Sequence, residues 1–223
     1  FNRPMSIKDT IERIKWITNH FNHKNPSVLE IGSASGHFLN AMKKEGFNVT
    51  GIELTYEMVK YSRSLGLRVL DKPLTYLKPD SEFDLIVSFH CLEHISNPTE
   101  TFAAIKKAMK PNGVFMGEAP NQDDWRMSMF DNVVVKRFHY DPNHNFYYSP
   151  VTFENYITKS GLFLKKLETV ERYNTLTQLN RILSDEYDTH DIGNLLDRDI
   201  YKRVSENIRL NDEEKDKKIY FQK

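Results

Sequence analysis

Short apolar segments alternate with helical patterns through the first half of the chain, and this alternation limits the fold more than any other feature. The candidate strands lie at 27–31, 48–53, 67–70, 83–89 and 114–118. The candidate helices that separate them lie at 38–45, 56–65 and 98–109. Strands and helices that alternate at this spacing predict a parallel sheet covered by helices on both faces. The expected fold class is α/β, with a doubly wound, mostly parallel, seven-stranded Rossmann-like sheet.

The two ends of the chain carry further expected elements. Apolar residues at helical spacing predict an N-terminal helix within 1–25. After the alternating region we expect a helix at 150–159 and a strand at 161–169. Helical patterns then predict a C-terminal cap over 172–210, inserted above the ligand face. Residues 219–222 are either a last strand, antiparallel to 161–169, or a frayed terminus.

Composition sets broad limits on function. The 223 residues suit a single domain, with 31 basic and 31 acidic side chains and therefore no net charge. Proteins that bind a nucleic-acid backbone usually carry a basic excess, so nucleic acid is an unlikely partner. The single cysteine, Cys91, excludes an internal disulfide and favours a cytoplasmic setting. The longest apolar runs are too short to span a membrane.

The first strand-to-helix turn is the most informative motif. Glu30 lies near the end of the first strand, and Gly32 to Gly36 form a turn of small residues. Small residues let the backbone approach a ligand closely. Glu53 closes the second strand, where a carboxylate accepts both hydroxyls of an adenosine ribose. The pattern predicts an adenosine-containing ligand at this edge of the sheet.

Two cofactors fit such an edge. A dinucleotide needs Gly-x-Gly-x-x-Gly, so that its pyrophosphate meets a helix N-terminus, and this chain has Ala34 where the middle glycine would stand. Glu30 would also place negative charge near the phosphates. S-adenosylmethionine (SAM) has no phosphate, and its ammonium group suits a carboxylate. Electrostatics therefore favours SAM over NAD.

Four segments together resemble the motifs of class I SAM-dependent methyltransferases, including the ubiquinone-type O-methyltransferases. Residues 28–39 (VLEIGSASGHFL) are similar to the glycine-rich first motif, and 51–54 (GIEL) to the acidic second motif. Residues 83–95 (FDLIVSFHCLEHI) resemble the fourth-strand motif, and 110–121 the segment around the fifth strand. The resemblance covers a SAM-binding core over 26–121, in the family's order and spacing.

The resemblance implies a set of cofactor contacts along this edge. Glu53 would bind the ribose and Leu54 the adenine, while Asp71 is a candidate for the adenine amino group. Phe89 and His90 would lie near the transferred methyl. The complete set of expected cofactor residues is Glu30, Gly32, Ser33, Gly36, Phe38, Glu53, Leu54, Asp71, Phe89 and His90.

The motif His90-x-x-Glu93-His94 admits three interpretations. Its similarity to a zinc-protease motif is set aside, since that motif needs a continuous helix. Glu93 and His94 are either hydrogen-bonded structural residues or catalytic residues, with His94 or His144 as a metal-free general base. Alternatively, with His144, all three bind a divalent metal, as the resemblance to small-RNA 3′-terminal 2′-O-methyltransferases implies. A metal would orient an acceptor hydroxyl and lower its pKa.

Residues 122–149 are expected to form an insertion on the substrate side of the pocket. Arg126, Lys136 and Arg137 within it suit an anionic acceptor, such as a phosphorylated or nucleotide-linked sugar. The leading hypothesis is methylation of a small polar metabolite at oxygen or nitrogen. The alternatives are an RNA 3′-terminal 2′-O-methyltransferase and a non-catalytic SAM-binding regulator, and the sequence leaves the oligomeric state open.

Overall fold

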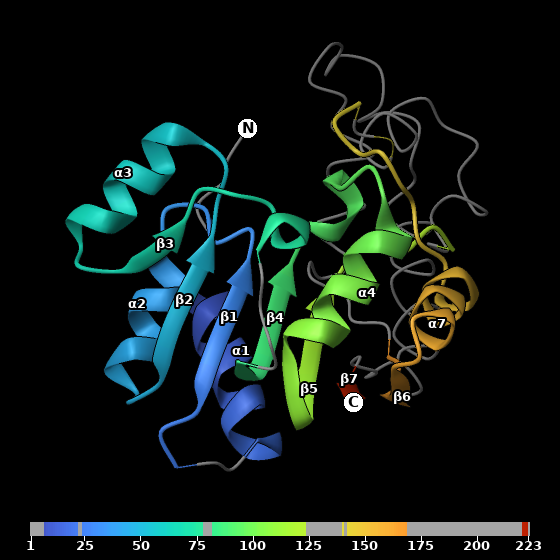
Figure 1. Cartoon of the computed structure of the whole chain (residues 1–223), viewed down its shortest axis with the longest axis horizontal. Helices are drawn as coiled ribbons and strands as arrows, with labels where there is room; N and C mark the ends of the chain where they lie inside the picture. Colours follow the sequence, from blue (N-terminus) through green and yellow to red (C-terminus); the bar gives the residue numbers. More distant parts are fainter. Residues whose placement is uncertain are drawn as a thin grey trace, which may run out of the picture.

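The core of the protein is a seven-stranded sheet with the strand order β3-β2-β1-β4-β5-β7-β6 (Figure 1). The computed structural model describes residues 7–21, 24–77, 82–123, 140, 142–168 and 220–222. The strands are β1 Ser27–Ile31, β2 Asn48–Ile52, β3 Arg68–Leu70, β4 Phe83–Phe89, β5 Met109–Glu118, β6 Phe163–Lys166 and β7 Tyr220–Gln222. The first five run parallel, and β7 pairs antiparallel with both β5 and β6.

Helices cover both faces of this sheet. They are α1 Ile7–His20, α2 His37–Lys44, α3 Tyr56–Ser64, α4 Pro98–Ala108 and α7 Pro150–Lys159. One core cluster joins α1, α2 and α3 to the sheet, and the other joins α4 and α7 to its opposite face. The neighbours Val28 and Leu29 of β1 belong to different clusters, because successive strand residues point to opposite faces. Figure 1 shows α4 in front of the sheet and α1 behind it.

The topology places the expected ligand edge at the centre of the sheet. β1 pairs in parallel with β2 on one side and with β4 on the other, so the chain reverses its direction of winding at β1. Ligands of open α/β sheets bind at the carboxyl ends of the strands beside such a switch point. The arrowheads of β1, β2 and β4 point to this edge in Figure 1.

The predicted fold class is confirmed, with differences in detail. β5 starts at Met109, five residues before the predicted strand, and its pairing with β4 shifts register between Phe83 and Leu85. The extra residues include Pro111, which cannot donate to the ladder, and Asn112 at φ 64°. β6 is shorter than predicted, and residues 220–222 form the antiparallel last strand.

Two predicted regions fall largely outside the described residues. The cap over 172–210 lies entirely outside them, as does most of the insertion at 122–149, including Arg126, Lys136 and Arg137. In the part that is described, none of the helices combines the length and apolar character needed to cross a bilayer.

Candidate active site

The turn after β1 is built around glycines in a left-handed conformation. Gly32 has φ +76° and Gly36 has φ +74°, a region that L side chains rarely adopt. The backbone N–H groups of Gly32 and Ser33 both donate to the carbonyl of Ile52, which ties the turn to the end of β2. A Cβ at Gly32 would lie 2.5 Å from Sγ of Cys91. The turn therefore packs directly against the segment that follows β4.

Glu30 is the most unusual ionisable residue of this edge. It lies in β1 and is 1% exposed, and its Oε2 accepts no hydrogen bond among the described residues. Burial raises the pKa of this carboxyl to about 8; the nearby Arg13 guanidinium lowers it, and the Glu53 carboxylate raises it further. A buried carboxyl with an unused oxygen can receive a cationic hydrogen-bond donor.

Glu53 lies at the end of β2 and is held by backbone donors. Its Oε2 accepts from the N–H of Ala34 at 2.8 Å, across the turn. Its Oε1 accepts from the N–H groups of Leu54 at 2.8 Å and Thr55 at 2.7 Å. A carboxylate offers about four lone-pair sites, so it retains capacity for a further donor such as a hydroxyl. Glu30 and Glu53 thus flank the two sides of one turn.

The other expected cofactor residues fall into exposed and buried groups. Leu54 is 60% exposed beside Glu53. Asp71, after β3, forms an exposed ion pair with Arg63 at 3.5 Å. Phe38 is 1% exposed and packs edge-to-face on Phe89, with ring centroids 5.0 Å apart, so these two rings support the edge from within the core.

His90 follows β4 in a conformation that is rare for residues other than glycine. Its φ is +51°, and its N–H donates to the carbonyl of Glu118 at 2.9 Å. The imidazole lies between two carboxylates: Nδ1 is 3.6 Å from Oε1 of Glu93, and Nε2 is 3.7 Å from Oε2 of Glu118. Backbone strain of this kind is concentrated at functional sites.

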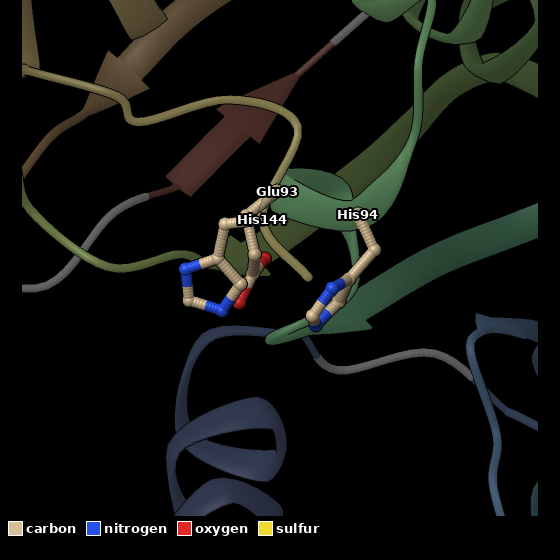
Figure 2. Close-up of side chains that lie close together, drawn as sticks. All are labelled: Glu93, His94 and His144. Carbon is tan, nitrogen blue, oxygen red and sulfur yellow. The ribbon is translucent and has the colours of Figure 1, made fainter. Parts of the chain in front are cut away.

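Glu93, His94 and His144 form a cluster of metal-ligating side chains. Each offers one ligand atom, and these three atoms lie within 4.8 Å of one another. Figure 2 shows the three side chains extending toward the same space. Glu93 and His94 belong to the 3₁₀ helix η2 (Leu92–His94), whereas His144 comes from the segment before α7. His90, also predicted from the sequence as a metal ligand, is not part of this group.

Hydrogen bonds between distant segments hold the cluster together. The N–H groups of Asn145 and Phe146 donate to the carbonyl of Glu93 at 2.8 and 3.0 Å. The side-chain amide of Asn145 donates to the carbonyl of His94 at 2.6 Å. Nδ1 of His94 is 2.9 Å from the carbonyl of Asn143. A protonated Nδ1 would donate this bond and leave Nε2 with a free lone pair.

Two charged residues of this edge were missed by the sequence analysis. Arg13 of α1 is 7% exposed, binds Glu118 at the end of β5 and lies over the Phe89 ring at 4.2 Å. Arg13 stands on a helix whose apolar pattern gave no sign of a polar contact. For Glu118, the only sign of a functional role in the sequence was its position at the end of a strand, at the ligand edge.

Comparison with known proteins decides the family. A model described as a methyltransferase domain matches residues 3–166. The chain belongs to the class I SAM-dependent methyltransferases. SAM is the cofactor of this family of methyltransferases. The enzyme class predicted from the sequence is therefore confirmed.

Similar proteins with known names and similar solved structures are methyltransferases too. The chain is 27% identical to a ubiquinone biosynthesis O-methyltransferase of Hydrogenovibrio crunogenus over 193 residues, which cover 80% of this chain and 78% of the relative. It is 25% identical to the one of Rickettsia canadensis, over 50% of this chain and 49% of that relative. A SAM-dependent methyltransferase structure from Archaeoglobus fulgidus aligns with TM-score 0.65 and 22% identity, over 96% of this chain and 94% of that one.

Proposed function

We propose that the methyltransferase transfers the methyl group of SAM to a hydroxyl of a small polar metabolite. The observation that carries the proposal is the pair of acidic side chains on either side of one glycine turn, Glu30 buried and Glu53 held by backbone donors. O-methylation is supported by the names of the relatives. The zero net charge favours a small acceptor over nucleic acid.

The proposed cofactor contacts follow from groups with unused capacity. Oε2 of Glu30 would accept from the methionyl ammonium, and Ser33, whose buried Oγ lacks a hydrogen-bond partner among the described residues, would bind the same part. Gly32 and Gly36 would shape the turn that faces it, because both have the positive φ that glycine adopts readily. Glu53 would accept the ribose hydroxyls, Leu54 would cover one face of the adenine, and Asp71 would reach the adenine amino group. Phe38, Phe89 and His90 would line the part of the site that holds the transferred methyl group of SAM.

Bound SAM supplies an electrophilic methyl group, and this chain's residues position the nucleophile and exclude water. Positioning and desolvation account for much of the rate enhancement in such displacements. Glu93 and His94 lie beside the β4 end, where a proton from the acceptor hydroxyl would be received. We assign this proton transfer to His94, whose exposed imidazole is oriented by Asn143.

A divalent cation at Glu93, His94 and His144 is a second element of the proposal. The donor set fits: Oε2 of Glu93 is buried with no hydrogen-bond partner among the described residues, and His94 directs Nδ1 to a carbonyl, as metal-bound histidines do. One carboxylate and two imidazoles suit zinc, manganese or iron better than magnesium. A cation here would lower the pKa of an acceptor hydroxyl. In that case His94 would be a ligand and not the base.

Calorimetry with SAM and S-adenosylhomocysteine tests the cofactor assignment, with NAD as the control ligand. We expect micromolar binding of both adenosyl compounds and none of NAD. Radiolabelled methyl transfer to catechol, histamine and a short RNA then separates hydroxyl, amine and RNA-end acceptors. Transfer to histamine or RNA without transfer to catechol would contradict the proposal, and loss of transfer in EDTA would support the cation.

The RNA 3′-terminal 2′-O-methyltransferase is retained as the second candidate because of one observation. The ligand atoms of Glu93, His94 and His144 lie within 4.8 Å of one another, and this grouping supports a metal-assisted reaction at an RNA end. An RNA substrate requires a basic surface to neutralise phosphates. Transfer to the RNA probe that falls steeply with added salt would favour this candidate over the small-molecule acceptor.

A further inference from the structure

Glu118 occupies a position at the acceptor side of the active site. It is the last residue of β5 and pairs in register with Phe89, the last residue of β4. Its side chain is 44% exposed, whereas Arg13, which binds it, is 7% exposed. The carboxylate therefore contacts a buried guanidinium and remains partly exposed to solvent, and Nε2 of His90 lies 3.7 Å from its Oε2.

Arg13 fixes the orientation of this carboxylate. Nε of Arg13 lies 3.1 Å from each of the two carboxylate oxygens of Glu118, and Nη2 of Arg13 also donates to Oε2. The guanidinium stacks on the Phe89 ring at 4.2 Å, which limits its own movement. A forked arginine contact of this kind gives the carboxylate a defined direction and leaves lone pairs for another donor.

The charges around Glu118 select the type of donor. The positive charge of Arg13 balances the negative charge of Glu118, so the pair offers a strong hydrogen-bond acceptor with no net charge. Glu30, within electrostatic reach of Arg13, adds no net charge either, because in the cofactor complex the methionyl ammonium would pair with it. An ammonium gains little from a neutralised carboxylate, and an anion is repelled by its oxygens. Of the three kinds of group, a neutral hydroxyl therefore loses the least free energy when it binds to this pair.

We propose that Glu118 binds a neutral hydroxyl of the acceptor and thereby determines acceptor specificity, with Arg13 as the residue that positions and neutralises it. The proposal rests on the O-methyltransferase function proposed above and specifies its substrate class. Acceptors with hydroxyl groups and no charge near the reacting centre are preferred over cationic or anionic analogues.

Three probes with the same pair of hydroxyls test the charge preference: catechol is neutral, dopamine cationic and 3,4-dihydroxybenzoate anionic at pH 7. Binding to the protein saturated with S-adenosylhomocysteine is measured by ligand-observed NMR titration, so that no sulfonium charge is present. We expect the wild-type protein to bind catechol at least about threefold more tightly than either analogue. Glu118→Gln should weaken the binding of catechol about tenfold, because a charge-assisted hydrogen bond is lost.

Arg13→Gln provides a result that a purely structural role would not give. It leaves the Glu118 charge without its counter-ion, so the preference should reverse and dopamine should bind better than catechol. Arg13→Lys restores the charge without the fork, and we expect it to restore the preference for catechol with weaker binding. Lys110→Gln is the matched control, because it also removes one positive charge from an ion pair, with Asp84 at the opposite edge of the sheet.

Three outcomes overturn the inference: Glu118→Gln binds catechol within twofold of wild type, Arg13→Gln keeps the wild-type order of probes, or none of the probes binds. Should Arg13→Gln fail to fold, Glu118→Gln and Arg13→Lys still decide the question. Failure of the wild-type protein to bind S-adenosylhomocysteine is a separate result, and it contradicts the proposed function itself.

Discussion

The two halves of the ligand edge hold their charged groups in different ways. On the β1–β2 side, Glu53 is held by the backbone N–H groups of its neighbours Leu54 and Thr55 and of Ala34, 19 residues earlier, and the glycine turn lies against the end of β2. On the β4–β5 side, Glu93 and His94 are held by residues 143–146, and Glu118 by Arg13 of the first helix. One half is local and the other joins segments far apart in the sequence.

This difference separates what the fold keeps constant from what it can vary. Local backbone contacts reproduce the same geometry whenever the turn forms, which suits a cofactor shared by a whole family. Side-chain contacts between distant segments change with single substitutions, and loops carried on a rigid scaffold commonly provide specificity. We therefore expect substitutions in the β1–β2 half to act on SAM, and those in the β4–β5 half to act on the acceptor.

Gly32→Ala should have the largest effect. The new Cβ would lie 2.5 Å from Sγ of Cys91 and at a φ of +76°, so both the turn and the segment after β4 must shift. Overpacking of this kind costs about 1–3 kcal/mol beyond the backbone strain. We expect SAM binding, measured by calorimetry, to weaken at least about hundredfold.

Gly46→Ala is the matched control for this substitution. Gly46 has φ +90°, but a Cβ there would meet nothing within 4 Å. The Gly46→Ala variant shares the strain of a positive φ but lacks the clash. The melting temperature of this variant should therefore fall, while its SAM affinity stays near that of the wild type. Equal SAM affinity in Gly32→Ala and Gly46→Ala would show that the turn does not approach the cofactor.

Glu30→Gln should change SAM binding and its dependence on pH. The pKa of Glu30, raised by burial to about 8, means that the carboxyl is mainly protonated at pH 7. The SAM ammonium prefers the carboxylate, so wild-type affinity should rise as the pH increases from 7 toward 8. We expect Glu30→Gln to bind about tenfold more weakly at pH 8 and to lack this rise, as measured by calorimetry across the pH range.

The same residue predicts a change in stability. Because the folded pKa of about 8 exceeds the ordinary value of 4.5, the folded chain binds more protons than the unfolded chain between these pH values. The free energy of unfolding should therefore decrease as pH rises from about 4.5 to about 8. Glu30→Gln should lose this decrease, whereas Glu154→Gln, at an exposed position of α7, should keep it. A decrease that persists in Glu30→Gln would exclude Glu30 as its origin.

The β1–β2 half of the ligand edge could be predicted from the sequence better than the β4–β5 half, for a physical reason. Glu30, Gly32 and Glu53 belong to short segments whose spacing follows from strand and turn geometry, so the pattern can be recognised along the chain. The contacts of Arg13 with Glu118 and of Asn145 with His94 depend on tertiary packing, and single residues of these types are common on any surface. The start of β5 was missed because Pro111 and Gly113 usually mark a turn, yet here they lie in a register shift.

Substitution of the cluster histidines should affect the acceptor half alone. If Glu93, His94 and His144 bind a cation, His144→Ala should weaken zinc or manganese binding about 10- to 100-fold and lower methyl transfer, with SAM affinity unchanged. Metal content after purification without chelators and transfer to catechol are the measurements. His37→Ala removes an exposed histidine at the start of α2, away from the cluster, and should leave the metal content unchanged. Unchanged metal content in His144→Ala would remove His144 from the site.

Asn145→Ala should have the smallest effect, and it tests how the distant segments are joined. Its side chain donates to the carbonyl of His94, but the backbone bonds from Asn145 and Phe146 to the carbonyl of Glu93 remain after the substitution. Loss of one exposed hydrogen bond costs about 0.5–1.5 kcal/mol. We expect a melting temperature a few degrees lower and an increase of about twofold to fivefold in the KM for catechol, with the KM for SAM unchanged. An equal rise in both KM values would show that the segment at 143–146 supports the whole edge, and the division into a cofactor half and an acceptor half would then not hold.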